Sequence, residues 1–160
     1  EILGKVVRRE QLAVIRPQIV AGGTIEAPSG RHSRERTKMA VSNRGKPAVT
    51  HYRVEEKFRT HTLIRVILET GRTHQIRVHM SWKGHPITGD PVYGKRLHVP
   101  PASSEKLINT LRGFKRQALH AETLALHHPR SGELLSWTVP VPPDMQALID
   151  ALREDKQEHA

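Results

Sequence analysis

Residues 71–94 concentrate the side chains of this chain that could do chemistry. The segment reads GRTHQIRVHMSWKGHPITGDPVYG and holds three Arg or Lys residues, three His residues, one Asp and four Gly. Thr73 is placed to cap a helix over Thr73–Trp82, which the turn at Gly84–Pro86 would end. A second turn at Gly89–Pro91 follows. A basic helix held between two turns predicts a site for an anionic ligand or for a buried acidic partner.

Arg77 is the residue of this segment that most needs a partner. Its neighbour Val78 indicates that this part of the helix is half-buried, and a half-buried guanidinium requires a carboxylate or a phosphate. Asp90 is the one acid nearby, so a structural salt bridge is one interpretation. The Gly-Asp-Pro setting of Asp90 is more typical of a turn-forming residue, which leaves a ligand as the alternative.

A second basic cluster lies in residues 29–46, which we expect to be a loop with a short strand at Met39–Ser42. Four cations fall within eight positions of this loop, namely Arg31, Arg34, Arg36 and Lys38. Contacts to phosphates, which position RNA or DNA without reading its sequence, are the favoured interpretation. A solvated surface loop is the alternative.

Metal and hydrolase chemistry find little support in the sequence. His74 and His79 are five residues apart and so do not share a helix face, while the adjacent His127 and His128 would point to opposite faces of a strand. No acidic cluster joins the eleven histidines, and there is no cysteine. The G-x-S-x-G motif of a Ser-His-Asp hydrolase is also missing. We therefore expect no metal site.

Length and charge describe a single basic domain. The chain has 160 residues and a formal net charge of +10, so nucleic acid is the favoured partner, ahead of an anionic membrane. No apolar stretch approaches 18 residues, and we expect no membrane contact. The lack of cysteine fits a cytoplasmic protein. With no large exposed apolar stripe in the pattern, we expect a monomer.

The elements that must position these residues follow from hydrophobic periodicity and turn signals. Pro17 interrupts the first strand and predicts an edge strand or a bulge there. The fold class is α+β, a mainly antiparallel mixed sheet flanked by short helices. We expect strands at Leu12–Val20, Ala48–Phe58, Thr62–Glu69, Ala118–Leu126 and Glu133–Val139, and helices at Thr73–Trp82, Ser103–Arg112 and Pro142–Asp155.

The order of these motifs resembles the RluA/RluD family of pseudouridine synthases. G-R-T-H-Q-I-R-V-H-M followed by G-H-P-I-T-G-D-P-V-Y-G is similar to that family's signature, and segments 36–41, 45–52, 117–121 and 128–132 agree in order. The resemblance covers roughly residues 5–155. It implies the pseudouridine synthase catalytic fold and isomerisation of uridine to pseudouridine in RNA, with large-subunit ribosomal RNA expected, and without cofactor or metal.

The same resemblance implies roles for individual residues. Members flip the target base into a cleft, where an aspartate nucleophile acts. Arg77 falls at the family's basic active-site position, where it would ion-pair with that aspartate and keep it ionised. The loop cations Arg31, Arg34, Arg36 and Lys38, together with Arg72 and His74, would touch the RNA backbone.

Two departures from the family pattern shape the functional hypothesis. The family's nucleophile lies in an H-R-L-D-x-x-T-S-G stretch, which this sequence does not contain, and Gln11 stands where the family has a base-stacking tyrosine. We therefore expect residues 1–160 to be the C-terminal portion of the catalytic domain, without the nucleophile-bearing segment or the N-terminal S4-like domain. Alone it should bind RNA weakly and be inactive. A non-catalytic RNA-binding module and a degenerate homologue are the alternatives, and Gln11 favours the latter.

Overall fold

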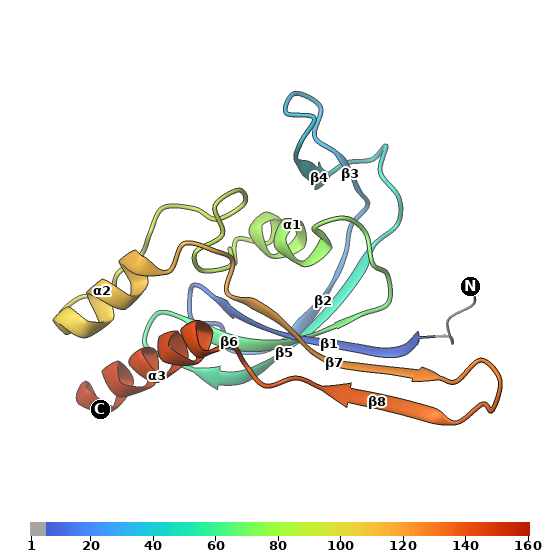
Figure 1. Ribbon diagram of the computed structural model, residues 1–160. Coiled ribbons are helices and arrows are strands. Elements are labelled where there is room, and N and C mark those ends of the chain that lie inside the picture. The colour runs from blue at the N-terminus through green and yellow to red at the C-terminus, as the bar shows by residue number, and fades with distance from the viewer. Residues whose placement is uncertain (1–5) are drawn as a thin grey trace.

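The computed structural model describes residues 6–160, so the first five residues of the expected domain lie outside the description (Figure 1). Six strands form one sheet in the order β2-β5-β6-β1-β7-β8, and β3 and β4 form a separate hairpin; every strand pair is antiparallel. The predicted α+β class is confirmed. The elements are β1 (Val6–Ile15), β2 (Gly23–Glu26), β3 (Ser29–Arg31), β4 (Met39–Val41), β5 (Val49–Lys57), β6 (Thr62–Leu68), α1 (Gln75–Trp82), α2 (Glu105–Gly113), β7 (Leu119–His127), β8 (Leu134–Thr138) and α3 (Pro143–Glu158).

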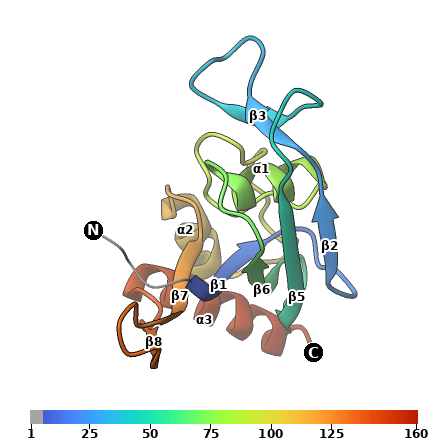
Figure 2. The same cartoon turned by 90° about the vertical axis from the view of Figure 1, so that its right-hand side faces the viewer.

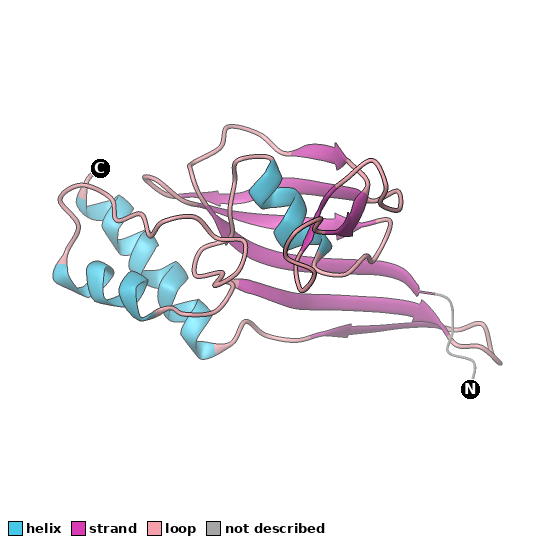
Figure 3. Cartoon of the chain, turned by 90° about the horizontal axis from the view of Figure 1, so that it is seen from above, coloured by secondary structure: helices cyan, strands magenta, loops and turns pink. Residues whose placement is uncertain are grey.

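The helices are divided between two regions of the sheet. Helix α1 lies over one face of the sheet, and the β3–β4 hairpin projects beyond it (Figures 1 and 2). Helices α2 and α3 lie together at the other end of the molecule, as the view from above shows (Figure 3). The apolar residues of the central strands and of all three helices form one core, which includes Ala13, Val14, Ile15, Ile64, Val66, Ile76, Met80, Leu107, Leu111, Leu148 and Leu152.

The first strand differs from the prediction. We expected Leu12–Val20 at an edge or a bulge, but β1 ends at Ile15 and lies in the middle of the sheet, between β6 and β7. Proline has no N–H to donate and cannot belong to a strand that is paired on both sides, so the strand ends before Pro17. The strand extends further toward the N-terminus instead, and its pairing with β7 shifts register between Glu10 and Gln11.

The other boundaries agree with the sequence pattern except around the two turn-rich regions. Strands β5 to β8 and the helices α2 and α3 begin and end within three residues of the expected positions. Strand β4 confirms the short strand near Met39. Strands β2 and β3 were missed, because four- and three-residue strands in Gly- and Ser-containing segments carry little periodicity. Helix α1 begins at Gln75, two residues after the predicted start at Thr73.

Candidate active site

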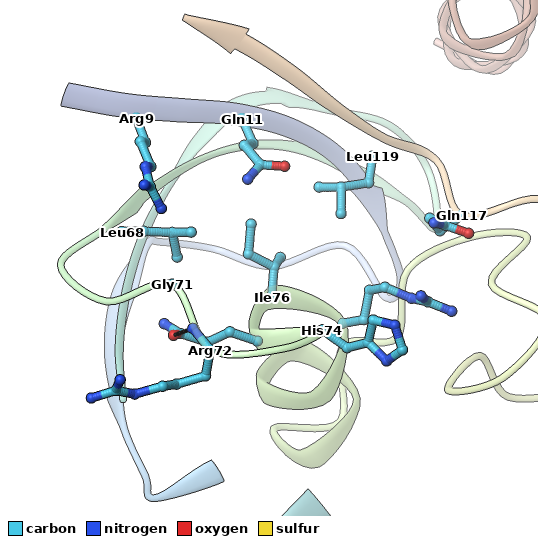
Figure 4. Close-up of a pocket in the computed structure, with 11 residues that line it drawn as sticks. Arg9, Gln11, Leu68, Gly71, Arg72, His74, Ile76, Gln117 and Leu119 are labelled. Carbon is cyan, nitrogen blue, oxygen red and sulfur yellow. Dashed lines mark hydrogen bonds between the residues drawn. The ribbon is translucent and has the colours of Figure 1, made fainter. Parts of the chain in front are cut away.

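A cavity of about 350 Å³ lies between α1 and strands β1, β6 and β7. Gln11 on β1 and Leu119 on β7 point toward Ile76 of α1, and Arg9 on β1 points toward Leu68 and Gly71, as Figure 4 shows. The lining residues are Arg9, Gln11, Leu68, Gly71, Arg72, His74, Gln75, Ile76, Arg77, Gln117 and Leu119. Leu68, Ile76 and Leu119 give the cavity an apolar floor. The lining includes three arginines and no acid, so its rim is cationic.

Gln75 holds the start of α1 against the sheet. Its side chain is buried, and Oε1 accepts hydrogen bonds from the Thr70 hydroxyl (2.6 Å) and the Arg72 N–H (3.0 Å). Its Nε2 donates to the Val49 carbonyl and to the Thr50 hydroxyl, both at 2.9 Å. Gln75 thus fastens the turn before the helix to strand β5. The helix starts two residues later than predicted, and its N-cap position is His74 rather than Thr73, without a side-chain capping hydrogen bond.

His74 precedes the helix in a left-handed conformation. Its φ is 52° and ψ is 25°, and its side chain makes no capping hydrogen bond to the helix. A non-glycine residue in this region is uncommon, and such strain is concentrated at functional sites. The conformation places the His74 ring at the wall of the cavity, edge-on to the ring of Tyr93.

Arg77 and Asp90 form a bidentate ion pair. Nε of Arg77 donates to Oδ2 of Asp90 at 2.8 Å and NH2 donates to Oδ1 at 2.9 Å, with side-chain exposures of 11% and 1%. Burial acts to raise the pKa of Asp90, but the hydrogen bonds from Arg77 and from the Val92 and Tyr93 N–H groups outweigh it and lower the pKa below its usual value. Hydrogen bonding to Asp90 likewise raises the pKa of Arg77.

Asp90 combines both roles that the sequence left as alternatives. Its Oδ1 also accepts the backbone N–H groups of Val92 (2.9 Å) and Tyr93 (3.1 Å), so it forms the turn and the salt bridge at once. Gly89 brings it into place with φ of +79°, and a Cβ at Gly89 would lie 2.3 Å from the Arg116 carbonyl oxygen. The preference for a turn role alone was therefore incomplete.

Tyr93 is a site residue that the sequence reading passed over. Its ring lies under the Arg77 guanidinium at 5.0 Å, its carbonyl accepts from Ser81 Oγ, and its hydroxyl contacts both the Met39 N–H and His74 Nδ1. An aromatic residue three positions after the Asp of a Gly-Asp-Pro turn was the available signal. Tyr93 connects the turn, the helix and the β3–β4 hairpin.

The predicted RNA-contacting residues separate into two groups. Arg72 and His74 line the cavity with Arg77. The Arg72 side chain extends away from the centre of the cavity (Figure 4), and its Nε donates to the Pro47 carbonyl. Of the loop cations, Arg31 lines a neighbouring groove. Arg34 and Arg36 are exposed outside both cavities, and Lys38 pairs with Glu35 at 3.1 Å.

The neighbouring groove adds cations that the sequence reading did not select. It has a volume of about 430 Å³ and shares Gly71 and Arg72 with the first cavity. Arg44 and Lys46 lie in it beside Arg31 and Arg72, and none of its lining residues is acidic: Ser29, Gly30, Arg31, Met39, Arg44, Gly45, Lys46, Gly71, Arg72 and Thr73. Four positive charges without a counter-charge make a surface suited to phosphates.

Two observations concern metal ions and membranes. Among residues 6–160, no group of three or more His, Cys, Asp or Glu side chains is arranged to hold a metal ion. His79 is buried in the scaffold, where Nε2 donates to the Ala27 carbonyl and Nδ1 contacts the Thr50 hydroxyl. In this same part of the chain no helix is both long and apolar enough to cross a bilayer.

With this geometry established, comparison with known proteins identifies the class. The family model of RNA pseudouridylate synthase matches residues 4–82, which carry β1, the basic hairpin and the Arg77 helix. In solved structures, the fold is similar to human RNA pseudouridylate synthase domain containing 1 (TM-score 0.65, 26% identity, 91% of this chain and 65% of that chain). Human RNA pseudouridylate synthase domain containing 4 gives a TM-score of 0.67 at 25% identity, over 91% of this chain and 62% of that chain. The chain belongs to the RNA pseudouridylate synthase family.

Among curated proteins, the chain is similar to bacterial enzymes named ribosomal large subunit pseudouridine synthase D. It is 56% identical to that of Xanthomonas campestris pv. campestris over 93% of this chain and 45% of the relative. It is 55% identical to that of Escherichia coli K12 over 96% of this chain and 47% of the relative. It is 53% identical to that of Pseudomonas aeruginosa PAO1 over 98% of this chain and 49% of the relative. The chain thus spans about half the length of these relatives.

Proposed function

We propose that this chain is the Arg77-bearing, RNA-binding part of a pseudouridine synthase that acts on large-subunit ribosomal RNA. The observation that carries the proposal is the cavity that Arg77, His74 and Gln11 line over an apolar floor, with Arg72 at its edge. Its volume of about 350 Å³ accommodates a flipped base, and its rim attracts the flanking phosphates. The names of the relatives support ribosomal RNA as the substrate.

The role of Arg77 rests on the unused edge of its guanidinium. Asp90 occupies Nε and NH2, and NH1 has no hydrogen-bond partner in the described part of the chain. We assign NH1 to the nucleophilic aspartate that the family resemblance implies. Arg77 would then bridge two carboxylates, held by the first and keeping the second ionised, because a neighbouring cation favours the charged form.

The aspartates of this chain are poor candidates for that nucleophile. Each is engaged by an arginine: Asp90 by Arg77, Asp144 by Arg116, Asp155 by Arg59 and Asp150 by Arg153. None of the four lines the cavity. We therefore assign the nucleophile to the half of the family's sequence that this chain does not span, and we place these 160 residues in the C-terminal portion of the catalytic domain. We further propose a cytoplasmic monomer that works without cofactor or metal.

A chimera tests the proposal. The chain replaces the matching part of the Escherichia coli relative, and tritium release is measured from large-subunit ribosomal RNA labelled at uracil C5. We expect release by the chimera, at least a hundredfold slower release after Arg77→Gln with RNA affinity retained, and none from the 160-residue chain alone. The matched control is Arg59→Gln, which breaks the similarly buried bidentate pair with Asp155, because neither of these residues lines the cavity.

The competing function is that of a degenerate homologue, which binds RNA without catalysis, and Gln11 favours it. A glutamine in the cavity cannot stack on a base as a tyrosine does. A folded chimera that binds RNA but releases no tritium would establish that function. Release by the 160-residue chain alone would instead overturn the assignment of the nucleophile to the other half.

A further inference from the structure

A chain of hydrogen bonds runs from the β3–β4 hairpin to the cavity through Tyr93. The Met39 backbone N and the Tyr93 hydroxyl oxygen are 2.9 Å apart, and that oxygen lies 2.8 Å from Nδ1 of His74. The ring of Tyr93 is itself fixed, because the Arg77 guanidinium lies over it and Asp90 accepts its backbone N–H. Three segments that are distant in sequence therefore meet at one hydroxyl group.

The direction of these hydrogen bonds determines the tautomer of His74. A backbone N–H can only donate, so the Tyr93 oxygen accepts from Met39. Among the described residues the phenolic proton has one acceptor within hydrogen-bond distance, His74 Nδ1, and pointing it there gives every group at this hydroxyl a partner. A nitrogen that accepts a proton in this way carries none of its own. The ring proton of His74 is therefore on Nε2.

The same contact keeps the ring neutral. Protonated His74 would carry hydrogen on both nitrogens and would oppose the Tyr93 proton. Burial lowers the pKa of His74, and the positive charge of Arg77 lowers it further against the smaller opposing effect of Asp90. Near pH 7 the cavity thus contains a neutral N–H donor beside three cations.

A neutral donor suits a neutral acceptor. Arg9, Arg72 and Arg77 already offer positive charge for phosphates and carboxylates, whereas Nε2 of His74 has no partner within residues 6–160. A uracil ring presents two carbonyl oxygens and no anionic group. We propose that His74, set by Tyr93 as the neutral Nε2–H tautomer, donates a hydrogen bond to a carbonyl oxygen of the uracil ring in the cavity. This rests on the function proposed above.

The tautomer can be measured on the 160-residue chain without RNA. Two-bond ¹H–¹⁵N NMR of labelled chain should show His74 protonated at Nε2 and bare at Nδ1 at pH 7. Tyr93→Phe should produce a mixture of tautomers and move the Met39 amide resonance. The control is Tyr52→Phe, because the Tyr52 hydroxyl makes no hydrogen bond within the described residues. This variant should change neither the tautomer of His74 nor the Met39 amide resonance. A wild-type proton on Nδ1 overturns the inference.

RNA binding by two variants tests whether residue 74 must supply an N–H donor at the position of Nε2 or only a polar side chain. Asparagine mimics Nδ1 of histidine and tolerates the left-handed conformation, whereas glutamine places an N–H near the position of Nε2. The probe is a single-stranded RNA pentamer with one central uridine, compared with the same RNA carrying an abasic centre. We expect His74→Asn to weaken binding of the uridine RNA about tenfold and His74→Gln to weaken it less than threefold. Neither should change binding of the abasic RNA.

The same binding experiment distinguishes a failure of the His74 inference from a failure of the proposed function. If wild-type chain prefers uridine RNA but His74→Asn retains that preference, the donor role of His74 is wrong and the proposed function stands. If wild-type chain shows no preference for the uridine RNA, both are wrong.

Discussion

The guanidinium of Arg77 and the carboxylate of Asp90 form the same two hydrogen bonds, at 2.8 and 2.9 Å, as Arg116 and Asp144 do elsewhere in the chain. The two pairs differ in exposure. The side chains of the first are 11% and 1% exposed, and those of the second 41% and 51%. Identical geometry in two environments allows the contribution of burial to be measured directly.

Asp90→Asn should destabilise the chain by about 2–4 kcal/mol, because it leaves a half-buried guanidinium without its counter-charge. Asp144→Asn should cost less than about 1 kcal/mol, since an exposed pair is hydrated and screened. Urea denaturation at pH 7 followed by circular dichroism measures both free energies of unfolding. Equal losses for the two variants would show that Asp90 acts through its turn alone, because asparagine preserves the acceptor for Val92 and Tyr93.

His61 should make stability fall between pH 6.5 and 4. Burial lowers its pKa from 6.5 to about 4, and the charges of His98 and Arg16 contribute against the opposing effect of Asp155. Above pH 6.5 the ring is neutral in both states. As the pH falls toward 4, the unfolded chain takes up a proton that the folded chain excludes, so stability is lost; below 4 both states are protonated and the loss stops.

The size of this loss follows from the difference between a pKa of 6.5 in the unfolded chain and about 4 in the folded chain, which corresponds to roughly 3 kcal/mol. Urea midpoints measured from pH 7.5 to 4 should fall more steeply for wild type than for His61→Gln. The exposed His98→Gln should retain most of the slope. A His61→Gln curve parallel to that of wild type would contradict the assignment.

Gln11→Tyr should strengthen binding of a uridine-containing oligonucleotide. Gln11 points into the cavity opposite Ile76, at the position where an aromatic ring could stack on a base. Stacking on an aromatic side chain contributes about 1–3 kcal/mol per base, so affinity should rise at least fivefold. Fluorescence anisotropy with the uridine pentamer measures it, and Gln11→Leu controls for apolar bulk. No gain over Gln11→Leu would mean that the base does not reach β1.

Neutralising the groove cations should reduce the salt dependence of RNA binding. In the Arg44→Gln/Lys46→Gln double variant, the slope of log K against log salt should become less negative by about 1.4, since each phosphate contact to a single strand contributes about 0.7. Arg34→Gln/Arg36→Gln removes the same charge from the exposed loop, outside the groove, and should change the slope less. The reverse order would place the RNA on the loop, where the sequence pattern first placed it.

Part of the site was readable from the sequence because its chemistry is local. The half-buried position of Arg77 followed from its neighbour Val78, whereas the places of Arg72 and His74 in the site were implied by the family resemblance. Gln11 was singled out by resemblance, and the structure places it in that cavity. The pattern missed Tyr93, the groove residues Arg44 and Lys46, and the buried hydrogen bonds of Gln75, because these residues meet their neighbours from other segments only in the folded chain.

The sequence by itself determined the α+β class, most element boundaries, the basic character and the family resemblance, because periodicity, turn chemistry and charge are properties of contiguous residues. Tertiary structure decided which polar groups face each other. Strand β1 became central because its two neighbours pair with it, Asp90 became the partner of Arg77 because the Gly89 turn folds back onto α1, and the tautomer of His74 depends on a hydroxyl from Tyr93. Pairing across long separations in the chain depends on the packing of the whole sheet and helix, which no local pattern contains.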